Sequence, residues 1–389
     1  MESSESSRES PRIVKIEWAR LEGQRPRAAG SNARIGEHGT TVRPALARLT
    51  AEDGSSGFGA CRATREQAEG VLGARLQEAF SSPLGATERW VPLEYPLYDL
   101  VAKRAGQPVY ALAAGMAGRA LDDLPRPFRA PCYDTSLYFD DLHLDSNDAA
   151  AALIASEARE GYERGHRAFK IKVGRGGRHM DLEQGTQRDV AVIRAVRQAV
   201  GPQPPIMLDA NNGYNLNLTK RVLAETASCG IFWMEEAFHE DAVLYRDLRE
   251  WLDREGLPVL IADGEGQASP SLLEWARDRV VDVIQYDWMS YGFTRWLATG
   301  QQLDAWGARS APHHYGGYFG NFAAGHLAAP IRGFTYVEWD EATVPGCDTS
   351  AYVVRDGWVT LPDDPGFGLR LDEAVFSKAL ASDGFSLSL

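Results

Sequence analysis

The segment AFKIKV at residues 168–173 is the first of seven short apolar runs that each carry an ionisable side chain near their end. Amphipathic stretches separate the runs, as is typical of strands and helices that alternate in parallel βα units. One ionisable residue near the end of each run gives spacings of 37, 26, 30, 22, 26 and 25 positions, counted along Lys172, Asp209, Glu235, Glu265, Asp287, His313 and Glu338. The other six runs are PPIMLDA (204–210), GIFWMEEA (230–237), LPVLIADGE (257–265), VVDVIQYD (280–287), GARSAPHH (307–314) and TYVEWD (335–340).

This spacing favours a closed (β/α) barrel over an open doubly wound sheet. Such an open sheet usually carries a glycine-rich phosphate turn after its first strand, and no G-x-G-x-x-G motif follows any of the runs. An earlier segment, CYDTSLYF at 132–139, supplies a first strand and completes a set of eight. Catalytic side chains of barrels project from the carboxyl ends of the strands. We therefore expect the ionisable residues of the runs to meet at one mouth of the barrel.

Lys170 and Lys172 lie two positions apart on a predicted strand, so both side chains point to the same face. Phe169, Ile171 and Val173 point to the other face and can pack against the outer helices. Only six of the 41 basic residues are lysines, so a lysine pair indicates a need for an amine that titrates. Two ammonium groups in a partly dry site disfavour the charged form, which predicts a lowered pKa and a neutral amine that acts as a base.

Asp209, Glu235 and Glu265 end three consecutive runs. Three carboxylates that converge without a counter-ion would repel one another, so a cation is implied. An all-oxygen ligand set suits Mg²⁺, with water or substrate oxygens completing its octahedron. The sequence does not decide the ligand at two of the three positions, because Glu236 competes for the second position and Asp263 for the third.

Asp287 and His313 lie at the ends of the sixth and seventh predicted strands, which are neighbours around the predicted barrel. An aspartate that accepts a hydrogen bond from one imidazole nitrogen leaves the other nitrogen to act as acid or base. His314 points the opposite way if the segment is extended. Glu338, in the eighth strand, completes the ring and can hydrogen-bond a substrate oxygen.

The composition excludes several classes of protein. The chain has 389 residues, 44% of them hydrophobic, which is ample for a core and for two domains. A net charge of −13 disfavours nucleic acid and membrane surfaces as partners. No apolar stretch approaches a membrane span, and the serine-rich start lacks the apolar core of a signal peptide, so we expect a cytoplasmic protein. Four scattered cysteines favour neither disulfides nor a thiolate zinc site.

Outside the barrel the sequence predicts a disordered tail at 1–11 and a small α+β domain at 12–129. That domain begins with a strand-like segment, PRIVKIEWARLE. A loop rich in glycine and arginine at 23–39 follows, and helices are predicted around 65–80 and 93–105. The barrel itself is predicted to occupy 130–345, which leaves a C-terminal segment at 346–389.

The motifs of the runs, taken together, resemble those of the mandelate racemase subgroup of the enolase superfamily. The likeness extends to PLEYPLYDLVAKRAGQPVYAL (92–112) in the first domain and to LPDDPGFGL (361–369) near the C-terminus, so it covers nearly the whole chain from residue 12. One departure is Ala237, which stands where the family has a proline after the second metal ligand. The motifs that carry the resemblance are KIK (170–172), LDANNGY (208–214), MEE (234–236), DGE (263–265), IQYD (284–287), APHH (311–314) and VEW (337–339).

The resemblance implies an α+β capping domain, completed by the C-terminal segment, over a (β/α)₇β modified TIM barrel. It also implies one Mg²⁺ and removal of the proton α to a substrate carboxylate, giving an enediolate that the metal holds. A homo-oligomer is expected. The resemblance assigns Asp209, Glu235 and Glu265 to the metal, Lys172 to the base with Lys170 as its modulator, His313 and Asp287 to a second acid/base dyad, and Glu338 to the substrate carboxylate.

Two reactions fit these groups. Lysine and histidine can exchange roles in racemisation or epimerisation of a 2-hydroxy acid, or lysine can remove the proton while protonated histidine expels a β-hydroxyl. The 23–39 loop is polar and without aromatic residues, which favours an acid-sugar dehydratase. Asn211 and Arg27 are the candidate substrate-binding residues. A cycloisomerase is disfavoured because Asp287 stands where that subgroup has a lysine. A non-catalytic barrel that merely binds a sugar acid is disfavoured because the base and the metal ligands are intact.

Overall fold

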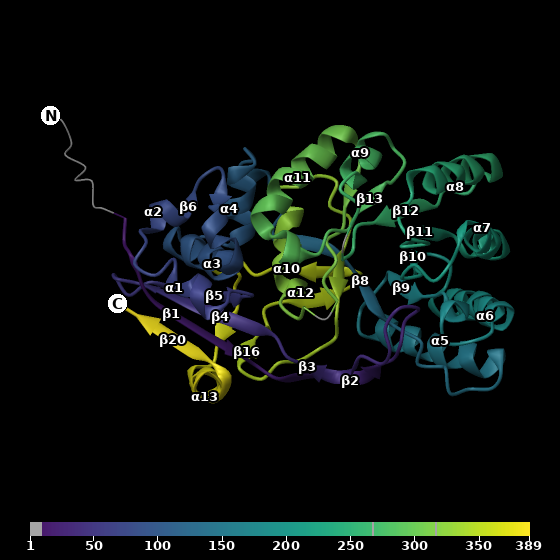
Figure 1. Cartoon of the computed structure of the whole chain (residues 1–389), viewed down its shortest axis with the longest axis horizontal. Coiled ribbons are helices and arrows are strands. Elements are labelled where there is room, and N and C mark those ends of the chain that lie inside the picture. Colours follow the sequence, from purple (N-terminus) through teal and green to yellow (C-terminus); the bar gives the residue numbers. More distant parts are fainter. Residues whose placement is uncertain (1–9, 267, 316) are drawn as a thin grey trace.

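The structure is a computed structural model, and it describes residues 10–266, 268–315 and 317–389. Most of the predicted disordered tail, residues 1–9, lies outside the described residues. Figure 1 shows two parts, with a smaller domain that carries both chain ends beside a larger barrel.

Within the described residues, eight parallel strands form the barrel. Each strand pairs with the next in chain order, and β15 pairs with β8. A bridge between Ser310 and Phe334 closes the remaining seam. The strands are β8 (Arg129–Leu137), β9 (Phe169–Lys172), β10 (Ile206–Asp209), β11 (Ile231–Glu235), β12 (Leu260–Asp263), β13 (Val283–Ile284), β14 (Arg309–Ser310) and β15 (Val337–Trp339).

The connections between the strands are mostly helical, and the longer helices cover the outside of the barrel (Figure 1). The helix that follows β9 illustrates why they form. Asp181 caps its N-terminus, Val192, Ile193 and Val196 bury one face, and Gly201 ends it. The helices are α5 (Asn147–Glu163), α6 (Leu182–Val200), α7 (Leu216–Glu225), α8 (Ala242–Glu255), α9 (Leu272–Arg277), α10 (Trp288–Tyr291), α11 (Phe293–Trp306) and α12 (Gly320–Ala323).

The (β/α)₇β barrel predicted from the sequence is therefore confirmed, although its strands are shorter than the apolar runs. The register places Lys172 opposite Asp209 and Asp209 opposite Glu235. These three residues consequently lie at one level of the barrel. Beyond β12, β13 and β14 the chain leaves the sheet before it reaches the predicted site residues, so Glu265, Asp287 and His313 stand on loops.

The smaller domain is built on an antiparallel sheet with the order β20–β1–β4–β5. One sequence prediction is wrong there: the helix expected at 65–80 is two short helices, because the chain turns through Gly70 and Gly73, the latter at a φ of 86°. The elements are β1 (Ile13–Arg20), β4 (Ala45–Ala51), β5 (Ser56–Ala60), α1 (Arg65–Glu69), α2 (Leu76–Ala79), α3 (Glu94–Arg104), α4 (Val109–Met116) and β20 (Phe385–Ser388).

The 23–39 loop of the sequence is a hairpin that extends from this domain to the barrel (Figure 1). Strands β2 (Gly23–Ala29) and β3 (Gly39–Val42) form its arms, and residues 30–38 form its tip. We call residues 23–42 the lid. Ser31 bridges to Phe139 just after β8, and the His179 ring lies 2.8 Å from the Asn32 carbonyl. The lid therefore contacts the barrel close to the carboxyl ends of β8 and β9.

The C-terminal segment contacts both parts of the protein. Strand β20 pairs with β1, and α13 (Glu373–Asp383) packs against the same strand. In contrast, β17 (Val353–Arg355) and β18 (Trp358–Thr360) form a hairpin that extends the barrel sheet through β8. We propose domain boundaries at 129/130 and 345/346, and the β17–β18 hairpin is the part of the C-terminal segment that pairs with the barrel sheet.

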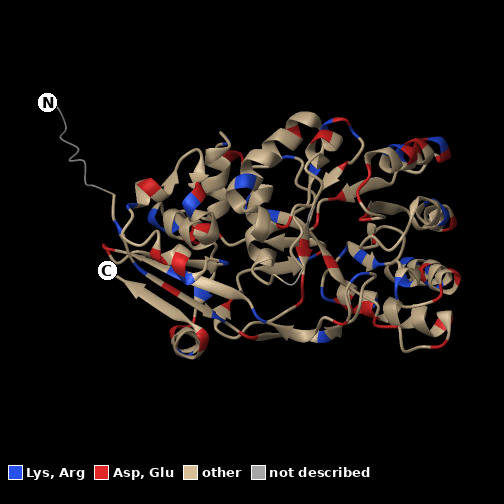
Figure 2. Ribbon diagram, in the orientation of Figure 1, with Lys and Arg blue, Asp and Glu red and all other residues tan. Residues whose placement is uncertain are grey.

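Charge is distributed in mixed patches on the outer surface. Figure 2 shows acidic and basic segments interleaved along α6 and α8. No helix in the described ranges combines the length and the apolar character needed to span a membrane. All four cysteines are buried and free.

Candidate active site

The predicted ionisable residues meet at the carboxyl ends of the barrel strands, next to the lid. Lys170, Lys172, Asp209, Glu235 and Glu338 are each at most 3% exposed. Such burial of unlike charges is stable only when each charge is paired and hydrogen-bonded.

Asp209, Glu235 and Glu265 form the carboxylate triad that the sequence predicted. One oxygen from each lies within 4.8 Å of the others. The competing residues face elsewhere: Asp263 accepts a hydrogen bond from the hydroxyl of Tyr245 on α8. Glu236, at a φ of 41°, turns away and accepts from Nδ2 of Asn211 at 3.0 Å.

The two lysines pair with these carboxylates. Lys170 Nζ lies 2.8 Å from Glu235 Oε1, 3.0 Å from Glu338 Oε1 and 3.3 Å from Asp209 Oδ2. Lys172 Nζ donates to Asp209. Burial alone lowers the pKa of Lys172 and Lys170 lowers it further, whereas the charges of Asp209, Glu265 and Glu235 raise it above its ordinary value. These three carboxylates are the predicted ligands of a cation, so the lowered pKa of the base stays a prediction for the protein with that cation bound.

His313 and Asp287 form the expected dyad. The Nδ1 atom of His313 lies 3.3 Å from Asp287 Oδ2, and its Nε2 atom faces Glu265 Oε1 at 3.4 Å. Burial opposes protonation, but Glu265, Glu338 and Asp287 raise the pKa of His313 to about 10. Backbone donors at Met289 and Ser290 also hold Asp287. The anionic neighbours of His313 thus favour its protonated form, which suits a proton donor.

Glu338 lies at the centre of the site with both oxygens in use. Its Oε1 atom accepts from Thr135 Oγ1 at 2.7 Å, and its Oε2 atom accepts from the backbone amides of His314 and Tyr315 at 2.8 and 3.1 Å. Burial alone would raise the pKa of Glu338, but Lys170 and His313 hold it well below the ordinary value. Glu338 is therefore a permanent anion that organises its neighbours. Its predicted contact with the substrate carboxylate stays a prediction.

His314 points away from its neighbour, as the extended segment predicted, and its ring is fully buried. Neither ring nitrogen has a hydrogen-bond partner among the described residues. Burial lowers the pKa of His314 to about 4. A buried neutral imidazole of this kind cannot donate a proton at neutral pH.

The two candidate substrate-binding residues differ in position. Asn211 joins the site, because its backbone amide donates to Asp209 Oδ1 at 3.0 Å and its side chain holds Glu236. Arg27 does not join it. Its guanidinium faces Asp140, Glu157 and Glu160 at 3.5, 3.3 and 3.2 Å, outside the catalytic cluster. The structure does not bring Arg27 to the catalytic cluster, because acidic groups beside β8 and on α5 hold its side chain, and its contact with the substrate stays a prediction.

Some residues of the site were missed in the sequence. Trp233 Nε1 donates to Glu235 Oε2 at 3.0 Å, and Thr135 holds Glu338. Tyr138 lies under the base, with Lys172 Nζ 5.2 Å from its ring centre, and Tyr315 packs against Tyr138. Strand alternation was an available signal for Trp233, because it lies two positions before Glu235 on the same strand.

The carboxylate triad fits a divalent cation. Its oxygens are hard ligands at a spacing that one ion can bridge, and Glu265 Oε2 is buried without a partner among the described residues. A cavity of about 420 Å³ opens beside Glu265 and leads to solvent. Arg34, Asn212, Glu236, His239, Glu240, Glu265 and Gly266 line it.

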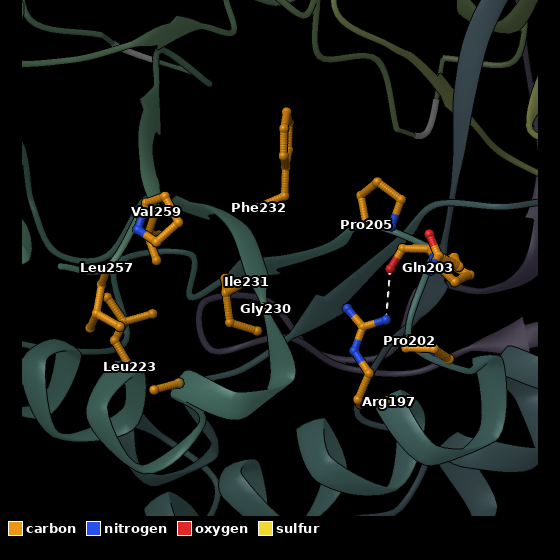
Figure 3. A pocket seen from close by; sticks show the side chains of 13 residues that line it. Arg197, Pro202, Gln203, Pro205, Leu223, Gly230, Ile231, Phe232, Leu257 and Val259 are labelled. Atoms are coloured by element: carbon orange, nitrogen blue, oxygen red, sulfur yellow. Dashed lines mark hydrogen bonds between the residues drawn. The ribbon is translucent and has the colours of Figure 1, made fainter.

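A second cavity, of about 310 Å³, lies at the opposite end of the barrel (Figure 3). Pro205, Ile231 and Val259, which precede or begin β10, β11 and β12, line it. Its one charged side chain among the described lining residues is Arg197, which donates to the carbonyls of Cys229 and Pro204. Without an acid, a base or a ligand set, this cavity is not a candidate for catalysis.

A family model described as "Enolase C-terminal domain-like" matches residues 153–375. The structure of a galacturonate dehydratase from Geobacillus sp., complexed with D-galacturonate and 5-keto-4-deoxy-D-galacturonate, is similar at 48% identity and a TM-score of 0.93, over 98% of this chain and 100% of that one. A mandelate racemase/muconate lactonizing protein from Geobacillus sp. Y412MC10, complexed with magnesium and tartrate, has 48% identity and a TM-score of 0.94, over 98% of each chain. Arabinonate dehydratase of Saccharolobus solfataricus is 26% identical over 72% of this chain and 69% of its own length.

Proposed function

The chain belongs to the enolase C-terminal domain-like family and, within the enolase superfamily, to the mandelate racemase group, and from this premise we propose that it dehydrates a hexuronate, with D-galacturonate as the first candidate. It is a Mg²⁺-dependent acid-sugar dehydratase in reaction type. One observation carries the proposal: Lys172 and the His313–Asp287 dyad stand on opposite sides of the carboxylate triad, on β9 and after β14. The dehydratase named above, with its uronate ligand, supports the choice of substrate.

The chemistry of a hexuronate matches these groups. Its carboxylate makes the C5 proton acidic, and its C4 hydroxyl is β to that carboxylate. A base takes the C5 proton. The C4 hydroxyl then leaves with a proton from an acid, which releases one molecule of water. The resulting enol becomes a ketone at C5, so the product is a 5-keto-4-deoxy acid. No oxidant or reductant is needed, because carbon is oxidised at C5 and reduced at C4.

Asp209, Glu235 and Glu265 would hold Mg²⁺, which supplies positive charge beside a carboxylate whose negative charge grows as the proton leaves. Lys172 accepts the C5 proton at Nζ, and Lys170 keeps the neighbouring carboxylates Glu235 and Glu338 in place. With the carboxylates engaged by a cation, fewer negative charges remain to raise the pKa of Lys172.

His313 donates the proton that converts the C4 hydroxyl into water. Asp287, which lies outside the triad, favours the cationic form of His313 and fixes the orientation of its ring through Nδ1. Racemisation or epimerisation of a 2-hydroxy acid is the second candidate, since the same two groups on opposite sides of the site can serve it.

The deciding experiment measures 2-keto acid formation by the purified protein with Mg²⁺ and a panel of hexuronates, aldonates and aldarates. We expect D-galacturonate to give a 5-keto-4-deoxy product with loss of the C5 hydrogen. Conversion of any panel member to its epimer, with no keto acid formed, would reject dehydration and support the second candidate.

Two further expectations stay proposals. A cytoplasmic location and a homo-oligomeric state come from the sequence and its resemblance. Light scattering on the purified protein tests the oligomer, and fractionation of the source cells tests the location.

A further inference from the structure

We propose that Arg25 is a positioning residue, which locks the lid to the last barrel strand and thereby sets the aromatic wall beside the base Lys172. The part of this inference that concerns Lys172 rests on the proposed function. The contacts that carry it run from Arg25 through Tyr315 and Tyr138 to Lys172.

The first step is a buried, two-pronged ion pair between the lid and the barrel. Nε of Arg25 donates to Asp340 Oδ1 at 2.9 Å, and Nη2 donates to Oδ2 at 2.8 Å. The two side chains are 7% and 3% exposed. Asp340 is itself fixed, because its amide donates to Asn321 Oδ1 and its carbonyl accepts from Asn321 Nδ2. Parallel hydrogen bonds of this kind give strong geometric preference as well as attraction.

The position of Asp340 connects this pair to the active site. Asp340 follows β15 directly and lies two residues after Glu338, so the two carboxylates share a face of the extended chain. The lid arm β2 is therefore bound to the strand that supplies the central anion of the site.

The second step is the contact of Arg25 with Tyr315. The guanidinium carbon of Arg25 lies 4.7 Å from the centre of the Tyr315 ring. The hydroxyl of Tyr315 is buried and has no hydrogen-bond partner among the described residues. No directional bond at its tip fixes the ring, so the groups packed around the ring determine where it lies.

The third step leads to the base. Tyr315 packs against Tyr138, with ring centres 4.8 Å apart, and His38 of the lid tip contacts both rings edge-on at 5.4 and 4.9 Å. The Tyr138 ring lies 5.2 Å from Lys172 Nζ. A continuous set of packed groups, Tyr315 and Tyr138, thus connects Arg25 to the amine of Lys172, which removes the proton. When the pair with Asp340 forms, the lid and the wall beside Lys172 are set together.

Arg27 shows that position on the lid is not sufficient. It lies two residues further along the same strand, yet it pairs with Asp140, Glu157 and Glu160. Its guanidinium also bonds Ser136, whereas the guanidinium of Arg25 lies over the Tyr315 ring, so Arg25 is the lid arginine that the structure connects to the base.

The test replaces Arg25 by alanine and by lysine and measures exchange of the substrate α-hydrogen in D₂O together with kcat and KM for keto acid formation. We expect Arg25→Ala to lower kcat and the exchange rate on the order of 10²-fold, as displacements near 1 Å do, with a smaller change in KM. Arg25→Lys keeps the charge but loses the two-pronged geometry, so it should recover only part of the rate. A change confined to KM, or none, would overturn the proposal.

Arg48→Ala is the matched control. Arg48 also pairs with a buried carboxylate, Glu17 at 2.8 Å, and lies 4.8 Å from the ring centre of Phe376. It belongs to the capping domain, and its partners Glu17, Glu373 and Phe376 lie outside the active site. It should lower thermal stability and leave kcat within about threefold. A loss of kcat in Arg48→Ala equal to that in Arg25→Ala would assign both effects to general destabilisation and reject positioning.

A second pair of variants tests the route through Tyr315. Tyr315→Leu should lower the exchange rate as Arg25→Ala does, and Tyr315→Phe should restore most of it because the ring remains. The double variant Arg25→Ala/Tyr315→Leu should be no slower than the slower single variant, since both changes interrupt one route. Additive losses would show that Arg25 acts by another route and overturn the proposal.

A readout without substrate separates this inference from the proposed function. Amide hydrogen exchange of residues 30–38 and 313–315 should become faster in Arg25→Ala and stay unchanged in Arg48→Ala. If the wild type dehydrates no uronate, the proposed function fails, while this exchange still decides whether Arg25 holds the lid. Unchanged exchange in Arg25→Ala would reject the lock whatever the substrate proves to be.

Discussion

Replacement of His313 by asparagine separates the two halves of a dehydration. Asparagine keeps a side chain that can hydrogen-bond Asp287, and the amides of Met289 and Ser290 continue to hold that carboxylate. Lys172 stands on β9, on the other side of the triad, with its partner Asp209 intact. The change therefore removes the proton donor and leaves the base and the metal ligands in place.

A positioned general acid contributes about 10²–10⁴-fold to a rate. We expect keto acid formation by His313→Asn to fall by that factor, while exchange of the C5 hydrogen with D₂O stays within about threefold of the wild type. Mass spectrometry and NMR of recovered substrate measure exchange, and a keto acid assay measures product. His143→Asn, at an exposed histidine away from the triad, is the control. Loss of exchange together with loss of product would refute the division of labour, because His313 would then be needed for proton removal.

Three further outcomes follow from the structure. Excess EDTA should abolish turnover and added Mg²⁺ restore it, and Asp209→Asn should weaken Mg²⁺ binding measured by calorimetry; full activity without metal would reject the triad. Lys172→Arg keeps the charge, but the guanidinium has a pKa too high for a base, so we expect a folded protein whose activity is reduced more than about 100-fold. Activity within about tenfold of the wild type would show that a cation suffices. Burial lowers the pKa of His326 to about 3, so the unfolded chain binds this proton first as the pH falls below 6.5. Stability should therefore decrease from pH 6.5 downward, by about 2 kcal/mol at pH 5 from this group, and urea midpoints of the wild type and His326→Gln should converge in acid; parallel pH profiles would contradict this.

Much of the site was predictable because strand geometry is periodic. Lys170 and Lys172 had to share a face, and Asp209 and Glu235 had to follow neighbouring strands, since residues two apart on a strand point the same way and parallel strands end at one edge. The resemblance to a known superfamily added the metal and the reaction. Strands β13 and β14 are short and end before Asp287 and His313. These two residues nevertheless form a parallel bridge with each other, so they lie side by side as predicted.

A sequence does not state the distances between charges. It placed Lys170 beside Lys172, but it did not show that Asp209 pairs with Lys172 and opposes the effect of Lys170 on its pKa. It likewise did not show that acidic residues on α5 and after β8 hold the side chain of Arg27. The aromatic wall came from Tyr138, the residue after β8, and from Tyr315, the residue after His314, so the composition of the lid did not predict it.

The sequence by itself determined the barrel, the order of its strands and the set of ionisable side chains at its mouth, because apolar periodicity and spacing depend on local geometry alone. The tertiary structure decided which of two adjacent acids points inward. Glu235 remains in the strand, whereas Glu236 turns out of it and is held by Asn211. It also decided that Arg25 pairs with Asp340 directly after the last barrel strand, whereas Arg27 pairs with acidic residues beside β8 and on α5. The first choice depends on a contact between residues 25 positions apart and the second on a contact between residues 315 positions apart, and only folding brings such residues together.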